Sequence, residues 1–438
     1  MTLSQNKITH RQVWQIAGPM IIANISIPLL GMVDTAVMGH LDSAQYLGAV
    51  AVGSIIFSFL FWGFGFLRMA TTGLVAQAFG RNDTTLSHTI LLQSLVLAII
   101  IASAILILKQ PLSQLAFLLI DSSEIVSQQA RIYFDIRIWS TPAILINYVF
   151  LGWLIGKQAS KAALVLVLVV TISNMIMDLV FVNVFGMTID GVALASLIAE
   201  YLGLITGLYL LKRHGVTIKL FKRLSSKQVS LFNWHWLQLH ANIFIRTLCL
   251  MFSFAFFTTQ GAKQGDIILA ANAVLLNFIT LMAFVLDGFA NATEVLSGKA
   301  VGAKNRSQLK QSLLLTGLWS FVVASLFSLS YLFFGQQLIS LMTSITDVQT
   351  TANNYLPWLM LMPVVAVWTY LFDGLFIGTT RSIEMRNTML LSTLCCFLPA
   401  WYFLQPLGNH GLWLALLLFL AARGVSQCFY LPRILRMY

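Results

Sequence analysis

The sequence predicts an all-α polytopic membrane protein with twelve transmembrane helices in two pseudo-symmetric six-helix lobes. Three observations lead there: an apolar composition, the length of the apolar runs, and the distribution of Lys and Arg. Of 438 residues, 58% are hydrophobic and 9% are charged, whereas a soluble domain carries about 25% charged residues. This composition excludes a cytosolic enzyme, a nucleic-acid-binding domain, a disordered chain and a secreted disulfide scaffold. The expected solvent is lipid.

The apolar runs are long enough to cross a bilayer as helices. A span needs about 20 apolar residues, and with its connection about 36, so the chain has room for about twelve. Barrel strands would alternate in polarity, whereas runs such as Leu95–Leu108 and Leu412–Leu420 are nearly unbroken. Helices are expected at 13–38, 46–76, 86–108, 124–150, 161–184, 189–211, 233–258, 266–292, 309–334, 349–374, 387–405 and 411–432.

Lys and Arg predict the orientation of these spans. With the N-terminus inside, 19 of them fall in inner segments, and only Lys109 and Lys263 fall in outer loops. This asymmetry places both termini in the cytoplasm and supports an even number of spans. We therefore expect a multi-pass protein of a bacterial-type cytoplasmic (inner) membrane, surrounded by the lipid bilayer and monomeric.

A basic connection near the middle of the chain separates the two lobes. We expect an N-terminal six-helix lobe at 1–211, a cytoplasmic basic linker at 212–230 and a C-terminal six-helix lobe at 231–438. A shift of 222 residues aligns three pairs: Thr71 with Thr293, Gly152 with Gly374, and Gly156 with Gly378. Six spans per half make both halves enter the membrane from the same side, as in parallel-repeat transporters. This architecture favours transport by analogy.

Polar residues within the spans predict an ion site in the first half. Asp34 lies deep in the first span, where an ionised carboxylate costs roughly 2.5–3.5 kcal/mol, so it should face the protein interior and bind a proton or cation. Asn174 and Asp178 lie four residues apart on one face of the fifth span. Two nearby acids can share a proton. The alternatives are an interfacial Asp34 and a structural polar patch between helices.

Pro19 and Pro28 predict a bend in the first helix. Each removes a backbone donor and disturbs the preceding turn. A bending helix that carries a protonatable Asp34 could act as a switch. A static kink is the alternative.

The second half offers candidates for a substrate cleft rather than a second ion site. Asp287 and Asp373 are candidate inward-facing acids, and Arg246 is a possible counter-charge. The residue 222 positions after Asp34 is Phe256, so the ion chemistry should be asymmetric and lie in the first half.

Other polar groups are interpreted as structural or uninformative. Asp135, which has Arg131 and Arg137 nearby in the fourth span, is expected to form structural ion pairs. The four Cys residues lie in apolar runs, and neither they nor the His residues show metal-ligand spacing. The chain has no His-Glu-x-x-His or Gly-x-Ser-x-Gly motif, so we expect no enzyme.

Several segments resemble one family, the multidrug and toxic compound extrusion (MATE) transporters. Gly18-Pro19-Met20 and the run from Val33-Asp34-Thr35-Ala36 to Leu41 look like the first helix of that family, most closely its DinF-like branch. Gly73–Gly80 resembles the end of its second helix, and Asn174 with Asp178 resembles its fifth-helix acid site. The likeness covers nearly the whole chain.

The resemblance implies a V-shaped fold of two six-helix lobes that exports cationic or amphipathic drugs as H⁺ or Na⁺ enters. It implies no cofactor besides the coupling ion. The family's ion-site residues carry over onto Asp34, Tyr133, Asn174 and Asp178, with Ser196 where the family often has Thr. A Na⁺ ion would bind at Asp34, Asn174 and Asp178.

We therefore expect a cation-coupled multidrug efflux antiporter that works by alternating access, with H⁺ favoured over Na⁺. The alternative within the same superfamily is a lipid-linked saccharide flippase. A flippase needs a cationic cavity for a pyrophosphate, and only Arg68 and Arg246 lie deep enough. A channel is an alternative of a different class, and electrical flux far beyond carrier rates would reveal it.

Overall fold

The computed structural model describes residues 7–39, 44–119, 123–217 and 233–437. Within these ranges every regular element is a helix. Most of the expected linker at 212–230, from residue 218 on, lies outside the described residues. Twelve described helical stretches are long and apolar enough to cross a membrane. Each overlaps one of the twelve spans expected from the sequence, so that prediction is confirmed.

Contacts divide the chain into two compact units. We call Ile22–Leu237 the first unit, and Gln238–Tyr438 together with Met1–Ile21 the second unit. The lobes expected at 1–211 and 231–438 stay a prediction. By contacts, the residues up to Ile21 group with the second unit, where Trp14 lies edge-on to Phe289 with ring centroids 5.2 Å apart.

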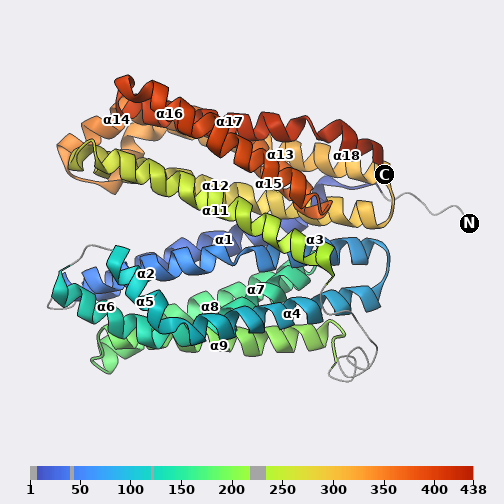
Figure 1. Cartoon of the computed structure of the whole chain (residues 1–438), viewed down its shortest axis with the longest axis horizontal. Coiled ribbons are helices and arrows are strands. Elements are labelled where there is room, and N and C mark those ends of the chain that lie inside the picture. The colour runs from blue at the N-terminus through green and yellow to red at the C-terminus, as the bar shows by residue number, and fades with distance from the viewer. Residues whose placement is uncertain (1–6, 40–43, 120–122, 218–232, 438) are drawn as a thin grey trace, which may run out of the picture. The chain divides into compact units, whose positions relative to one another are not determined.

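Helix α1 (His10–Gly39) is continuous and belongs to both units. The remaining helices of the first unit are α2 (Ala44–Gly63), α3 (Phe66–Gly80), α4 (Thr84–Ile107), α5 (Lys109–Leu119), α6 (Glu124–Arg137), the 3₁₀ turn η1 (Ile138–Ser140), α7 (Thr141–Gly156), α8 (Ser160–Leu179), the π turn η2 (Val180–Val184) and α9 (Ile189–Arg213). Helices α8 and α9 run side by side (Figure 1).

The second unit follows the same plan. Its helices are α11 (Trp234–Ala262), α12 (Asp266–Gly302), α13 (Arg306–Met342), α14 (Thr346–Gly378), α15 (Ser382–Leu390), the π segment η3 (Leu391–Phe397), α16 (Leu398–Leu404), the 3₁₀ turn η4 (Gln405–Leu407), α17 (Asn409–Cys428) and α18 (Leu431–Met437). Its core includes Trp413, Phe257 and Phe419, all fully buried.

The repeat of 222 residues reappears in the helix packing of each unit. Gly156 of α7 lies against Thr72 of α3, and Gly378 of α14 lies against Glu294 of α12. In both pairs a Cβ on the glycine would overlap the backbone oxygen of the facing helix, so the two helices approach closely only because no side chain intervenes. The same close contact at one constant offset confirms that the two halves are structural repeats.

The turns at the helix starts repeat as well. Asp83 caps α4 by accepting from the Leu86 amide at 2.8 Å, and Asn305 caps α13 by accepting from the Gln308 amide at 3.0 Å. Capping side chains of this kind satisfy donors that the first helical turn leaves unpaired. Asp83 and Asn305 are also 222 residues apart.

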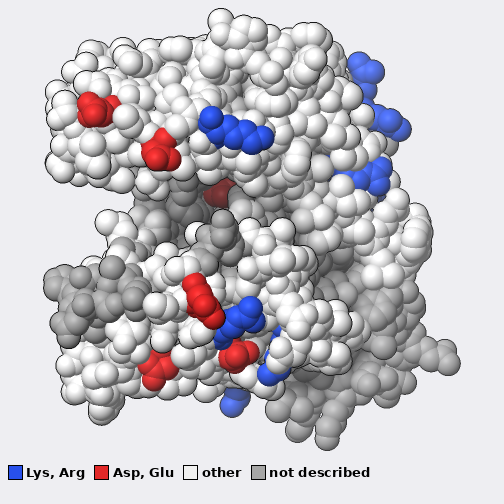
Figure 2. Space-filling model, turned by 60° about the vertical axis from the view of Figure 1, so that its left-hand side comes forward, with Lys and Arg blue, Asp and Glu red and all other residues white. Residues whose placement is uncertain are grey.

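The outer surface of the described helices is apolar. Many large side chains are exposed, among them Leu118 at 82%, Ile107 at 79% and Leu314 at 71%. On the face drawn in Figure 2, white side chains dominate and charged ones are few. Exposed apolar area of this extent marks a surface that is covered by something other than water, and here lipid provides the cover.

Candidate ion-coupling site

Two carboxyl groups meet in the interior of the first unit. Asp34 comes from α1 and is 7% exposed, and Asp178 comes from the last turn of α8 and is fully buried. The two groups lie within hydrogen-bonding reach of each other. About two helical turns earlier on each helix, the hydroxyls of Ser26 and Thr171 lie 3.5 Å apart and also join α1 to α8. The structure therefore brings together the two acids that the sequence singled out.

The backbone changes form directly after the second acid. Helix α8 ends at Leu179, and the π turn η2 follows from Val180 to Val184. Single π turns are uncommon and occur frequently at functional sites, because they reposition side chains without ending a helix. Asp178 is thus held at the junction between the two helical forms.

A hydrogen bond joins Asn174 of α8 to Ser196 of α9. Asn174, one turn before Asp178 on α8, donates from Nδ2 to the Ser196 hydroxyl of α9 at 3.2 Å. Both side chains are buried. In the described chain, Oδ1 of Asn174 accepts no hydrogen bond, so this amide oxygen can accept from a protonated carboxyl or coordinate a cation.

Tyr133 and Arg137 lie one turn apart on α6. The Tyr133 ring is fully buried and lies against Gly53 of α2, where any Cβ would overlap it. The Arg137 guanidinium donates to the Tyr133 hydroxyl and lies 5.4 Å from the ring centroid of Phe57. It interacts electrostatically with both Asp34 and Asp178. Arg137 therefore supplies a resident positive charge beside the acid pair.

The carboxyl oxygens of Asp34 and Asp178 outnumber the hydrogen-bond donors around them in the described structure. Within the described residues, both carboxyl oxygens of Asp178 and Oδ1 of Asp34 have no hydrogen-bond donor. Leaving a buried acceptor unsatisfied costs about 1–3 kcal/mol, and more for a charged group. Two carboxylates cannot hydrogen-bond to each other unless one carries a proton. The arrangement therefore suits uptake of a proton or a small cation between them.

The two prolines fall on either side of the point where α1 passes from one unit to the other. Pro19 belongs to the second unit and Pro28 to the first, yet α1 is helical through both. Next to Pro19, Gly288 of α12 lies against Ala17 and Ile21. The role of Pro19 and Pro28 in bending stays a prediction.

In the second unit the buried acid Asp373 is fully hydrogen-bonded, unlike Asp34 and Asp178 in the described part of the first unit. Asp373 of α14 accepts from Arg246 of α11 and from Arg423 of α17, and it accepts from Gln427 Nε2 at 2.7 Å. All four side chains are buried. Because its oxygens are already occupied by strong donors, Asp373 is poorly suited to bind a transported cation.

Asp287 lies on α12 (Asp266–Gly302), in the same unit as this ion-paired group. It is half-buried on α12, and its backbone oxygen accepts from Asn291 Nδ2 at 2.8 Å. Its charge acts on Tyr370, as do the charges of Arg246 and Asp373. The three candidate cleft residues therefore lie in one region of the second unit, and their role in substrate binding stays a prediction.

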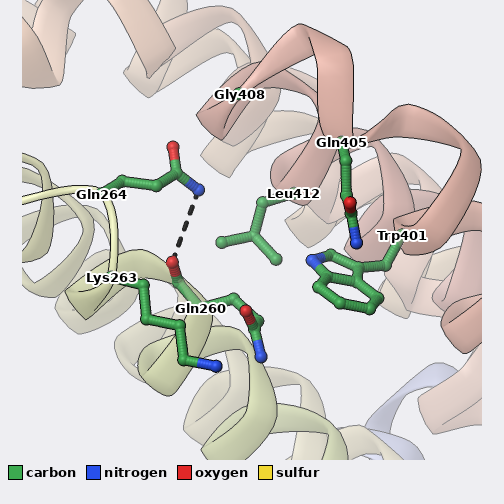
Figure 3. Close-up of a pocket in the computed structure, with 7 residues that line it drawn as sticks. All are labelled: Gln260, Lys263, Gln264, Trp401, Gln405, Gly408 and Leu412. Atoms are coloured by element: carbon green, nitrogen blue, oxygen red, sulfur yellow. Dashed lines mark hydrogen bonds between the residues drawn. The ribbon is translucent and has the colours of Figure 1, made fainter.

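A separate pocket of about 400 Å³ lies in the second unit. Figure 3 shows the side chains around it, from the end of α11, from α16 and η4, and from the start of α17. It is lined by Gln260, Lys263, Gln264, Trp401, Gln405, Gly408 and Leu412. None of the described residues that line it is an acid, and none was singled out for the ion or substrate site.

One interpretation of the fourth span was wrong. Asp135 forms no ion pair within the described chain with Arg131 or Arg137, and both Asp135 and Arg131 are exposed. Arg137 turns inward instead, toward Tyr133. The four-residue spacing between these two was the available signal, because it places them on one helix face.

The comparisons with known proteins identify the family. The MatE family model matches residues 19–180 and 243–402, one segment in each half of the chain. The chain belongs to the MatE family. The resemblance of its first and fifth helices to MATE transporters is thereby confirmed, and the second segment lies about 222 residues after the first, as the repeat requires.

Individual relatives of this MatE protein agree. It is 45% identical over 426 residues to the DNA damage-inducible protein F of Escherichia coli (strain K12), covering 95% of this chain and 91% of the relative. It is 22% identical to the probable multidrug resistance protein NorM of Bacillus subtilis (strain 168), over 98% and 96% of the two chains. A crystal structure of MATE in complex with MaD3S matches with a TM-score of 0.88 at 19% identity, over 98% and 97%. The MatE protein is thus a multi-pass membrane transporter.

Proposed function

We propose that this protein is a proton-coupled antiporter that exports cationic or amphipathic compounds by alternating access. The observation that carries the proposal is the buried pair of Asp34 and Asp178, whose facing oxygens lack donors in the described structure. Relatives named as multidrug resistance proteins support the substrate class. The distribution of Lys and Arg supports cytoplasmic termini in a cytoplasmic membrane, and we propose that the protein acts as a monomer.

The proposed cycle begins with the acid pair deprotonated. A proton from the outer side binds between Asp34 and Asp178 and removes their mutual repulsion. The bound proton is shared by the two carboxyl groups, while Asn174 remains on Ser196 and Arg137 remains on Tyr133. Because Asp34 is on α1, closing the carboxyl pair draws the half of α1 that follows Pro28 toward α8. The bound compound is released outward, and the proton leaves to the cytoplasm.

The flippase alternative loses one of its two deep cations. Arg246 donates to Asp373 and is not available to a pyrophosphate unless that ion pair breaks. Breaking a buried ion pair costs about 3–5 kcal/mol when one partner is left uncompensated. This favours the antiporter over the flippase.

Asp34→Asn tests the proposal. The amide has the same shape but cannot take up a proton, so it should abolish export of a cationic dye driven by an imposed proton gradient in proteoliposomes. Asp347→Asn is the matched control, because Asp347 is exposed in the first turn of α14. The protein must remain folded and inserted, which gel filtration and circular dichroism report. Wild-type dye export, or wild-type drug resistance in cells, with Asp34→Asn would refute the role of this carboxyl.

A further inference from the structure

A third carboxyl group of the first unit is not used by the cycle above. Glu200 lies on α9, one turn after Ser196, and is partly buried. Asn147 of α7 donates from Nδ2 to Glu200 Oε2 at 3.0 Å and also to the Glu200 backbone oxygen at 3.0 Å. These two hydrogen bonds need a glycine at position 203, since a Cβ on Gly203 would lie 2.9 Å from Asn147 Nδ2. Helix α9 is thus shaped to hold this carboxyl group in one place.

Among the described residues, one cation acts on all three carboxyl groups. Glu200 forms no ion pair within the described ranges, and the guanidinium that acts on it is Arg137, which also acts on Asp34 and Asp178. Nε of Arg137 is buried and, in the described chain, donates to no acceptor. The other titratable and charged groups around Arg137 and Glu200 are Tyr133 on α6, Tyr148 on α7 and, acting on Tyr148, Arg68 on α3.

One guanidinium cannot balance three carboxylates inside a membrane protein. Unpaired buried charges are costly, so the group should hold protons until its net charge is small. Arg137 stabilises whichever carboxylate is ionised. When one acid takes up a proton, the positive charge of Arg137 is balanced less, and it stabilises the remaining carboxylates more strongly.

We propose that Glu200 is a second proton-binding site of the first unit, linked to Asp34 and Asp178 through the shared guanidinium of Arg137. When the aspartates hold a proton, Arg137 stabilises the Glu200 carboxylate, and the Glu200 proton leaves as H⁺ to the cytoplasm. When the aspartates are ionised, Glu200 binds H⁺ from the outer side at a carboxyl oxygen, so that each cycle moves one more proton inward. Only O–H bonds form and break. This inference rests on the proposed proton coupling and extends it from one site to two.

The alternative is a purely structural role, in which Glu200 only holds α9 to α7. Glu200→Gln separates the two roles, because its amide oxygen still accepts from Asn147 while its side chain no longer binds a proton. Glu124→Gln is the matched control, since Glu124 is exposed at the start of α6.

The test measures dye export from proteoliposomes between pH 5.5 and 8.5, and the number of protons moved per dye from the reversal potential. For Glu200→Gln we expect about one proton fewer per dye. We also expect the half-maximal pH to move to lower values, because Arg137 then stabilises only the aspartates. Arg137→Gln should move it to higher values, because loss of the positive charge favours protonation.

The outcomes separate the two hypotheses. If the wild type ignores the proton gradient, the proposed function fails and the inference with it. If the wild type follows the gradient and Glu200→Gln keeps its stoichiometry and pH profile, only the inference is overturned. Shifts of the same sign in Glu200→Gln and Arg137→Gln would also overturn it. If Glu200→Gln does not fold, the wild type decides by its stoichiometry: two sites require about two protons per dye, and about one proton per dye would overturn the inference.

Discussion

At the scale of single residues, the two units use acids in opposite ways. Asp373 is saturated by two guanidiniums and an amide, whereas Asp34 and Asp178 keep oxygens without a donor in the described chain. A carboxylate whose oxygens already accept from strong donors offers little to a further cation. Oxygens that accept from no donor remain open to one. In the repeat, Phe256 occupies the position equivalent to Asp34, and this difference predicted an asymmetry between the two halves. The hydrogen bonds of the acids differ between the two units as well.

Ser196→Ala tests how the ion is held. The Ser196 hydroxyl accepts from Asn174 and, within the described residues, forms no hydrogen bond with either aspartate, so we treat it as a positioning group. Its loss removes one hydrogen bond, worth about 1 kcal/mol, and should change the apparent proton affinity of dye export less than about tenfold. The measurement is export rate against pH in proteoliposomes. Complete loss of export by a folded Ser196→Ala protein would instead show that the hydroxyl is a direct ligand.

At the scale of helices, the sequence predicted the elements well and the site only partly. Spans are set by apolar length, which is a local property, and so all twelve could be placed. Asn147 and Arg423 escaped attention because their roles depend on which helices become neighbours. In the sequence, Asn147 of α7 gives no sign of its role, because that role depends on Gly203 of α9 lying next to it in the fold. The grouping of α1 with both units likewise depends on tertiary contacts, such as that of Trp14 with Phe289.

The repeated glycine contacts make a prediction at this scale. Gly156→Ala and Gly378→Ala each place a Cβ against the backbone of the facing helix, so each should destabilise the protein by about 1–3 kcal/mol. Gly18→Ala is the control, since nothing lies within 4 Å of its Cβ position and alanine favours a helix. Thermal unfolding in detergent, followed by tryptophan fluorescence, measures the effect. Equal melting temperatures for all three variants would contradict the packing argument.

At the scale of the whole molecule, the repeat explains how one chain can be both stable and asymmetric. Helix contacts and caps recur at the same offset, so the scaffold of the two units is shared. The polar residues inside them differ, since Asp34 and Asp178 keep oxygens without a donor in the described chain, whereas Asp373 is ion-paired. Under the proposed function, a small cation taken up in the first unit drives the change of the whole protein, and transport measurements identify the gradient that supplies it.

Proteoliposomes with separately imposed gradients test that conclusion. An inward proton gradient at constant sodium should drive export of a cationic dye, and a sodium gradient at constant pH should not. The reason is that the Arg137 guanidinium acts electrostatically on both carboxyl groups, so a metal cation would be repelled by a charge that is already there. Empty liposomes and Asp34→Asn protein give the background rates. Export driven by sodium alone would show that Asp34, Asn174 and Asp178 bind Na⁺, and the coupling assigned to the proton would have to be replaced.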